Sequence, residues 1–242
     1  MIIPNYVPLP DEVVGNVAQA PYLARLGFIK RVSLRHLLSI WLLVPFTVGI
    51  NWPSVGLLYA VVTLAMGLIA LDLWRIAVRG RAIEAKVTEV LLIPLLGLVA
   101  WTLNQATDLG WPVWPLLVGP TCSFIYTLLC GRDYSFVGNY FLSLIGSTLI
   151  TALILRQLHL DPVHRTWSLS INALYLSYFI YDLASLQARR RVNEEFAAVV
   201  DLYRDIFNFP GYLLRVMKHW QRHQIWQLPK NQNTISESNQ LP

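Results

Sequence analysis

The chain has 242 residues, of which 55% are hydrophobic and 14% are charged, with a formal net charge of +5. Soluble domains carry about a quarter charged residues, so this composition excludes a soluble globular domain and a disordered protein. Long runs contain no Asp, Glu, Lys or Arg: 36–71, 90–107, 109–131, 134–155 and 166–181. Because about 20 apolar residues match the roughly 30 Å core of a bilayer, the sequence predicts an all-helical membrane protein.

Three other classes are also excluded. An outer-membrane barrel would alternate apolar and polar residues in segments of about ten, whereas these runs are continuous. A secreted domain held together by disulfides is excluded because the two cysteines, Cys122 and Cys130, lie on one predicted helix. They are about 12 Å apart along its axis, which is beyond disulfide reach. The basic residues flank the apolar runs, a placement typical of membrane topology rather than of nucleic-acid binding.

Three regions are expected along the chain. Residues 1–33, with four prolines, predict an irregular N-terminal lead-in, 34–218 a single seven-helix transmembrane domain, and 219–242 a polar, disordered tail. Six of the helices should span the bilayer, at 36–51, 54–78, 88–106, 111–131, 135–156 and 166–188. The short loops between them predict antiparallel neighbours in one compact bundle.

The orientation follows from the Lys and Arg residues beside the spans. With the N-terminus inside, the cytosolic segments next to the spans hold twelve of these residues, and the outer loops hold only Arg156 and Arg165. Cytosolic loops carry the excess of positive charge in membrane proteins. We therefore expect a cytosolic N-terminus.

A seventh helical segment, about 193–217, differs from the six spans. Glu194, Asp201, Asp205 and Asn208 form one polar stripe on an otherwise apolar cylinder. One interpretation is an amphipathic helix on the cytosolic membrane surface, and the other is a central helix that the six spans shield from lipid. Pro210 should end or kink the helix in either case.

Ionisable side chains within the membrane are functional-site hypotheses, because burying them is costly. Asp182 lies in the sixth span, and Asp72 and Arg75 lie at a similar depth in the second. The spacing of Asp72 and Arg75 also permits a simple ion pair within one helix. The same is true of Arg204 and its acidic neighbours, Asp201 and Asp205.

No catalytic motif is present. The chain has no nucleophile motif, phosphate-binding loop or dinucleotide fingerprint, so we expect neither an enzyme nor a bound cofactor. All five histidines fall at span ends, in loops or in the tail, which argues against haem ligation. Ser143, Ser147 and Thr151 recur every four residues on the fifth span, a spacing that suits close helix packing.

Three stretches resemble the Bax inhibitor family of membrane proteins. They are GRDYSFVGNYFLSLIG (131–146), YFIYDLASLQ (178–187) and DLYRDIFNFPGYLLRVM (201–217). The first is similar to the family's fifth-helix start, the second to its Tyr-Asp-Thr-Gln signature, and the third to its polar seventh helix. The resemblance implies a bacterial-type member with seven helices in the inner (plasma) membrane.

The resemblance also implies a site and an activity. By motif position, Asp182 and Asp205 correspond to the family's aspartate pair, which senses pH and controls a calcium leak. Arg75 is the candidate for the family's second-helix arginine that holds the closed state, and Asp201, Arg204 and Asn208 are candidate supporting residues. Two carboxylates in low dielectric share a proton. When both are ionised they can bind calcium weakly, since calcium prefers six to eight oxygen ligands.

The chain departs from the family pattern at three places. Pro210 is unusual in the seventh helix. Leu183 and Ala184 replace the Thr-Gln that follows the first aspartate, and Arg204 precedes the second aspartate, where the family has an aliphatic residue. These changes, with nine Trp residues, suit an alternative function: a non-transporting membrane scaffold or assembly factor that keeps the family fold. The expected partners are the lipid bilayer and calcium or protons, with no nucleic acid.

Overall fold

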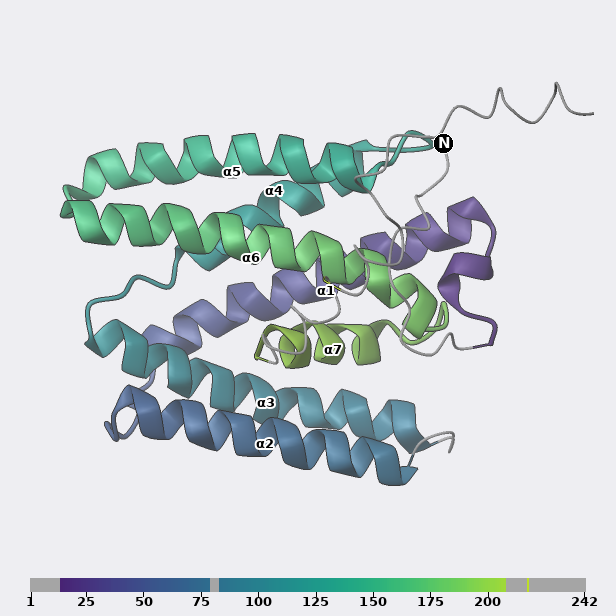
Figure 1. The fold of residues 1–242 in the computed structure, drawn as a ribbon, viewed down its shortest axis with the longest axis horizontal. Coiled ribbons are helices and arrows are strands. Elements are labelled where there is room, and N and C mark those ends of the chain that lie inside the picture. The colour runs from purple at the N-terminus through teal and green to yellow at the C-terminus, as the bar shows by residue number, and fades with distance from the viewer. Residues whose placement is uncertain (1–13, 79–82, 208–216, 218–242) are drawn as a thin grey trace, which may run out of the picture.

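The computed structural model describes residues 14–78, 83–207 and 217, apart from some side chains of α2 and α3. Every regular element within these ranges is helical (Figure 1). The elements are η1 (Val17–Gln19), α1 (Tyr22–Gly49), α2 (Leu57–Val78), α3 (Ile83–Asp108), α4 (Pro115–Leu129), α5 (Phe136–Leu158), α6 (Pro162–Arg189) and α7 (Glu195–Phe207).

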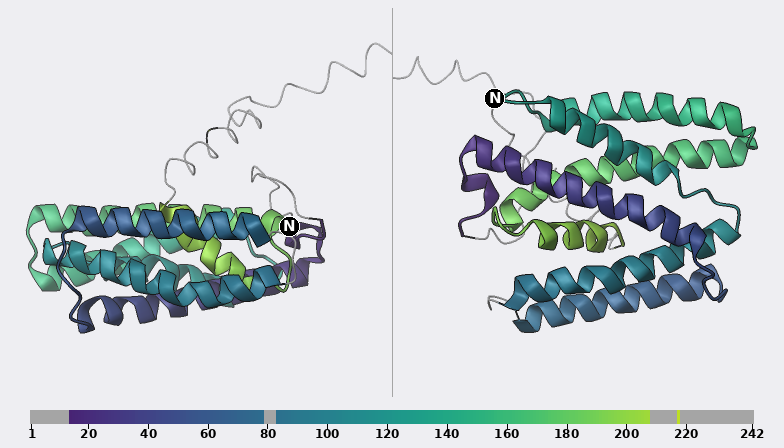
Figure 2. Two further views of the ribbon diagram at one scale, coloured as in Figure 1. Left: turned by 90° about the horizontal axis from the view of Figure 1, so that it is seen from below. Right: turned by 180° about the vertical axis from the view of Figure 1, so that it is seen from behind.

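The helices form two groups that α1 and α7 connect. One group is the hairpin of α2 and α3, and the other is the layer of α4, α5 and α6. Helix α1 packs against α3 and α4, while α7 packs against α1, α3 and α6. Figure 2 shows from behind how α1 crosses between the two groups. The short helix α7 therefore contacts both groups.

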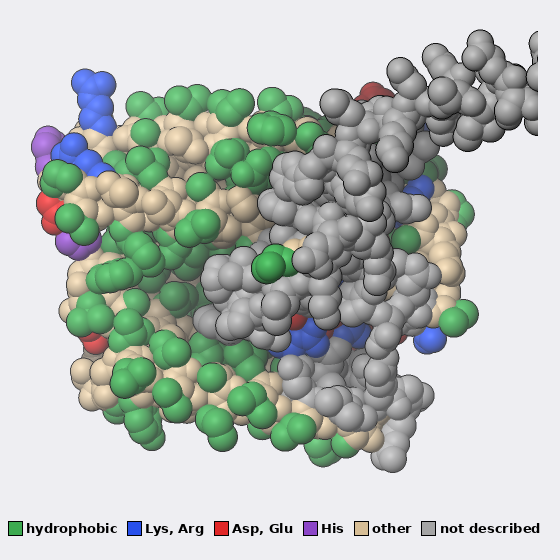
Figure 3. Space-filling model, in the orientation of Figure 1, with side chains coloured by type: hydrophobic (Ala, Val, Ile, Leu, Met, Phe, Trp, Pro, Cys, Tyr) green, Lys and Arg blue, Asp and Glu red, His purple; other side chains and the backbone are tan. Residues whose placement is uncertain are grey.

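Three of the described helical segments are long and apolar enough to cross a bilayer: Tyr22–Gly49, Glu89–Asp108 and Phe136–Leu158. Large apolar side chains stay exposed on the outside, since Leu58 and Leu129 are 79% and 81% exposed. Figure 3 shows hydrophobic side chains over one face and charged and histidine side chains at the end where α5 joins α6. These features indicate a membrane-embedded protein.

Helix boundaries differ from the expected spans mainly at N-terminal ends. Helix α1 begins at Tyr22, inside the expected lead-in 1–33, because its first turns bury the apolar side chains of Phe28 and Ile29 although they also carry Arg25, Lys30 and Arg31. Helix α6 begins at Pro162 rather than near 166. Its cap is Asp161, whose side chain accepts a hydrogen bond from the backbone N–H of His164.

Most of helix α7 is buried. Ala198, Val199 and Val200 have no exposed surface, and the side chains of Leu202 and Tyr203 are also buried. An amphipathic helix on the membrane surface would leave its polar face in water, whereas Asp201 and Asp205 on this helix are buried as well. The described part of α7 ends at Phe207, so Pro210 lies outside the described residues, as does the whole of the expected tail 219–242.

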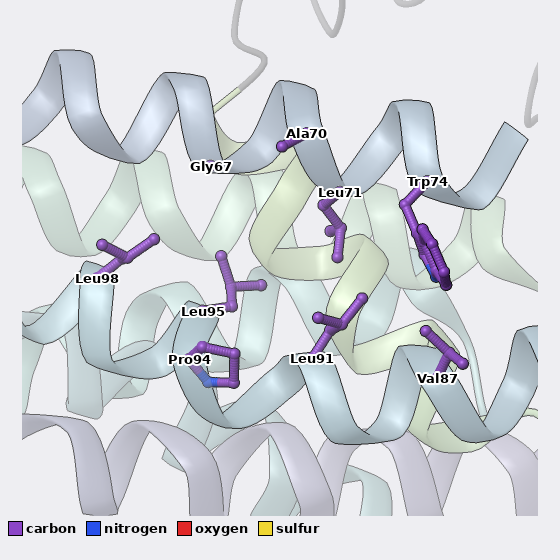
Figure 4. A pocket seen from close by; sticks show the side chains of 9 residues that line it. All are labelled: Gly67, Ala70, Leu71, Trp74, Val87, Leu91, Pro94, Leu95 and Leu98. Atoms are coloured by element: carbon purple, nitrogen blue, oxygen red, sulfur yellow. The ribbon is translucent and has the colours of Figure 1, made fainter. Parts of the chain in front are cut away.

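An apolar cavity of about 440 Å³ lies between α2 and α3 (Figure 4). Pro94 lies on its α3 side, where it removes one backbone donor from the helix. The described side chains that line this cavity are apolar, and neither Asp182 nor Asp205 is among them. Its lining residues are Gly67, Ala70, Leu71, Trp74, Val87, Leu91, Pro94, Leu95 and Leu98.

Close packing of α4 on α6 depends on Gly119. A Cβ atom there would lie 3.0 Å from Asn172 Oδ1 and 3.2 Å from Leu176 Cβ. We expect Gly119→Ala to lower the melting temperature, because overpacking costs about 1–3 kcal/mol and exceeds the gain in helix propensity of about 1 kcal/mol. The matched control is Gly97→Ala in α3, whose Cβ would meet no atom within 4 Å. Equal melting temperatures for the two variants would contradict this prediction.

Candidate functional site

Six charged side chains form one cluster where α6 ends and α7 packs against it. The three carboxylates are 1% or 2% exposed, and three guanidinium groups balance their charge. This balance reduces the free energy of keeping the charges out of water. We call this group the ionic cluster; its members are Asp182, Asp201, Asp205, Arg189, Arg190 and Arg204.

Arg189 connects the two aspartates that the sequence analysis singles out. Its Nη2 donates to Asp182 Oδ1 at 2.6 Å, and its Nη1 donates to Asp205 Oδ2 at 2.7 Å. Asp182 lies two helical turns before Arg189 on α6, whereas Asp205 belongs to α7. Charge-assisted hydrogen bonds of this kind are about twice as strong as neutral ones. One guanidinium group thus joins the end of α6 to α7.

The second half of the ionic cluster is centred on Asp201. Arg190 Nε donates to Asp201 Oδ2 at 2.6 Å, and Arg204 Nη1 lies 3.2 Å from Asp201 Oδ1. Arg204 Nη2 also donates to Asp205 Oδ1 at 2.8 Å. Arg204 therefore joins the two halves, so that Asp201 and Asp205 each pair with two guanidinium groups.

Hydroxyl groups complete the contacts around Asp182. Ser185 Oγ lies 2.9 Å from Asp182 Oδ1 and accepts a hydrogen bond from Arg189 Nη2 at 2.6 Å. The Tyr178 hydroxyl donates to the main-chain carbonyl of Leu202 and lies 3.5 Å from Asp182 Oδ2. Tyr178 thus ties the backbone of α7 to α6 beside the carboxylate.

The local sequence favours this arrangement of helix ends. A cation at the last turn of α6, Arg189, and an acid at the first turn of α7, Glu195, both complement the helix dipoles. The backbone N–H of Val17 in η1 donates to the carbonyl of Arg190 at 2.9 Å. Glu195 pairs with Arg31 of α1 at 2.6 Å. The turn between α6 and α7 is therefore held by both η1 and α1.

A buried aromatic group lies between α1, α6 and α7. The sequence analysis expects His36 at a span end, but α1 continues through it, and the residue is 1% exposed. His36 Nε2 lies 2.7 Å from the Tyr175 hydroxyl, and its ring stacks on Phe179. The Tyr203 hydroxyl lies 2.7 Å from Ser39 Oγ. These contacts position α7 against α1.

The structure brings together four of the predicted site residues and leaves two undescribed. Asp182, Asp201, Arg204 and Asp205 all belong to the ionic cluster. The Arg75 side chain and Asn208 lie outside the part of the chain that the structure describes. In the sequence, Arg189 and Arg190 are explained only as basic residues that set the orientation of the spans in the membrane. The spacing of seven residues between Asp182 and Arg189, which places both on one helix face, is the signal that identifies Arg189.

The cluster leaves little opportunity for direct metal binding in this conformation. Within the described ranges, no group of three His, Cys, Asp or Glu side chains is arranged to hold a metal ion. Guanidinium groups contact both oxygens of Asp205 and one oxygen of Asp182. A calcium ion that used these two carboxylates would have to displace Arg189.

No known protein family, no curated protein and no solved structure matches the chain. The ionic cluster and the sequence motifs are therefore the features of the chain that bear on its function.

Proposed function

We propose that the chain is a pH-sensitive calcium leak channel of the Bax inhibitor type, in which the part of the ionic cluster that Arg189 forms with Asp182 and Asp205 latches the gate. The single observation that carries this proposal is the bridge from Arg189 to Asp182 on α6 and Asp205 on α7, at 2.6 and 2.7 Å. Six spanning helices surround α7 in this proposal. The membrane is a bacterial-type inner membrane, and the positive-inside rule puts the N-terminus in the cytosol.

The latch responds to protons because its strength depends on ionised carboxylates. Protonating Asp182 or Asp205 leaves the buried Arg189 guanidinium without a full counter-charge, which is strongly unfavourable away from water. Helix α7 then separates from α6, and water enters. The aspartate of the pair that stays ionised then supplies oxygens of the hard type that calcium prefers, and a site with so few of them binds weakly enough to permit permeation. Flux should therefore rise as the pH falls.

The test is calcium flux into proteoliposomes at pH 6, 7 and 8. We expect wild-type flux to be highest at pH 6, and Asp182→Asn and Asp205→Asn each to raise flux at pH 8 and flatten the pH dependence, because asparagine cannot form the ion pair. Asp133→Asn is the matched control, since Asp133 is an exposed residue outside the cluster. If both cluster variants keep the wild-type pH profile, the latch mechanism is wrong.

A second candidate function is a non-transporting scaffold or assembly factor. It is favoured by Leu183, which follows Asp182 in the chain and whose side chain is fully buried in the hydrophobic core. In a scaffold, three cations and three carboxylates would serve only to fix α7 against α6. The same liposomes discriminate the two functions, because a scaffold gives no calcium flux above that of empty liposomes at any pH.

A further inference from the structure

A line of buried polar side chains runs along α5, away from the ionic cluster. Asn139, Ser143, Ser147 and Thr151 recur every four residues, and each is at most 1% exposed. At 1.5 Å per residue the line extends about 18 Å. The spacing of Ser143, Ser147 and Thr151 suits close helix packing, but small apolar residues would meet that requirement equally well.

The neighbouring helices add polar groups to the same interface. On α4 these are Ser123 and Thr127, and on α6 they are Ser168 and Asn172, all buried. Asn172 Nδ2 donates to Ser147 Oγ at 2.9 Å, which joins α6 to the line on α5. We call these eight residues the polar stripe: Ser123, Thr127, Asn139, Ser143, Ser147, Thr151, Ser168 and Asn172.

The polar stripe extends toward both ends of the helical layer. At one end Asn139 Nδ2 donates to the Tyr134 hydroxyl at 3.2 Å, just before α5 begins. At the other end Ser168 Oγ donates at 2.8 Å to the carbonyl of His164, in the first turn of α6. Polar groups therefore occur at successive helical turns between the two ends.

Three buried atoms of the polar stripe have no hydrogen-bond partner among the described residues: Ser123 Oγ, Thr151 Oγ1 and Asn172 Oδ1. Hydroxyls in helices commonly donate to the carbonyl four residues earlier, as Thr47 and Thr127 do in this chain. The hydroxyl groups of Ser123 and Thr151 make no such hydrogen bond. Buried polar groups nearly always have a hydrogen-bond partner. These three atoms therefore need a hydrogen-bond partner other than the described atoms of the protein.

We propose that the polar stripe binds a file of ordered water molecules, which forms a hydrated route between α4, α5 and α6. A buried water needs two to four polar partners, and the unpartnered atoms of three different helices supply them. Gly119 brings α4 close to Asn172 at this point, since a Cβ atom there would lie 3.0 Å from Asn172 Oδ1. No carboxylate belongs to the stripe, so water fits it better than calcium, which prefers charged oxygen ligands. This site is separate from the ionic cluster.

The test compares Thr151 with Thr47, two threonines whose side chains are both fully buried. The chain is labelled with carbon-13 threonine and reconstituted in bilayers, and solid-state NMR measures the transfer of magnetisation from water to each threonine. Thr151→Val and Thr47→Val identify the two signals by their loss. We expect the Thr151 signal to build up several-fold faster than the Thr47 signal, because Thr47 donates to its own helix. Equal, slow build-up for both would overturn the proposal.

Thermal stability gives an independent measurement on the same variants. In a hydrated stripe, Thr151→Val removes a partner of bound water and lowers the melting temperature. In a dry stripe, the same change replaces an unpaired buried hydroxyl by a methyl group and raises it. A melting temperature of Thr151→Val above that of the wild type would also overturn the proposal. Calcium flux should stay at the wild-type level in Thr151→Val, so this test is independent of the proposed latch.

Discussion

Replacing Arg189 by glutamine is expected to produce a channel that leaks calcium at pH 8 as fast as the wild type does at pH 6. Glutamine is neutral and too short to bridge Asp182 on α6 and Asp205 on α7, to which Arg189 donates at 2.6 and 2.7 Å. The two carboxylates then favour separation and hydration at any pH at which they are ionised. Flux into proteoliposomes at three pH values measures the effect.

The control for this variant is Arg191→Gln, two residues further along the chain, where the side chain is exposed. Removing one partner of a buried ion pair costs about 3–5 kcal/mol, so the melting temperature of Arg189→Gln must be measured alongside its flux. Arg189→Lys keeps the positive charge but lacks the planar guanidinium group that donates to both carboxylates. We expect this variant to fold and to show a calcium flux at pH 8 between those of the wild type and Arg189→Gln. A folded Arg189→Gln protein with the wild-type pH profile would show that Arg189 is not the latch.

The membrane character of the fold was predictable because it depends on composition and run length, which are local properties. The start of α1 was not, because a search for charge-free runs misses helical turns that carry cations between their apolar residues. Phe28 and Ile29 pack into the core from those turns. The same oversight placed His36 at a span end, whereas it lies inside α1 against Phe179.

The acidic half of the candidate site was predictable, and the basic half was missed. Asp182 and Asp205 stand out because ionisable groups within apolar helices are rare. Arg189 and Arg190 follow a span, where basic residues are expected for topology alone, so their second role is hidden. Arg189 reaches Asp182 through helical spacing within α6. Arg190 reaches Asp201 only because the turn after α6 brings α7 back against it, and η1 and α1 hold that turn.

The pairing of Arg190 with Asp201 should control stability rather than gating. Arg190 Nε donates to Asp201 Oδ2 at 2.6 Å, and both residues are buried. We expect Arg190→Met alone to lower the free energy of unfolding by about 3–5 kcal/mol, because it leaves the Asp201 carboxylate undercompensated. Arg190→Met combined with Asp201→Leu should recover most of this loss, since apolar replacement of both partners is often neutral.

Chemical denaturation of the two single variants and the double variant in detergent measures this coupling as a double-mutant cycle. Calcium flux in the double variant should keep its dependence on pH, because Arg189 still bridges Asp182 and Asp205. If the two single effects simply add, Arg190 and Asp201 are not coupled in the folded protein. If the double variant folds but loses its pH response, the latch extends over the whole ionic cluster, and Arg204, which contacts both Asp201 and Asp205, becomes the residue that connects its two halves.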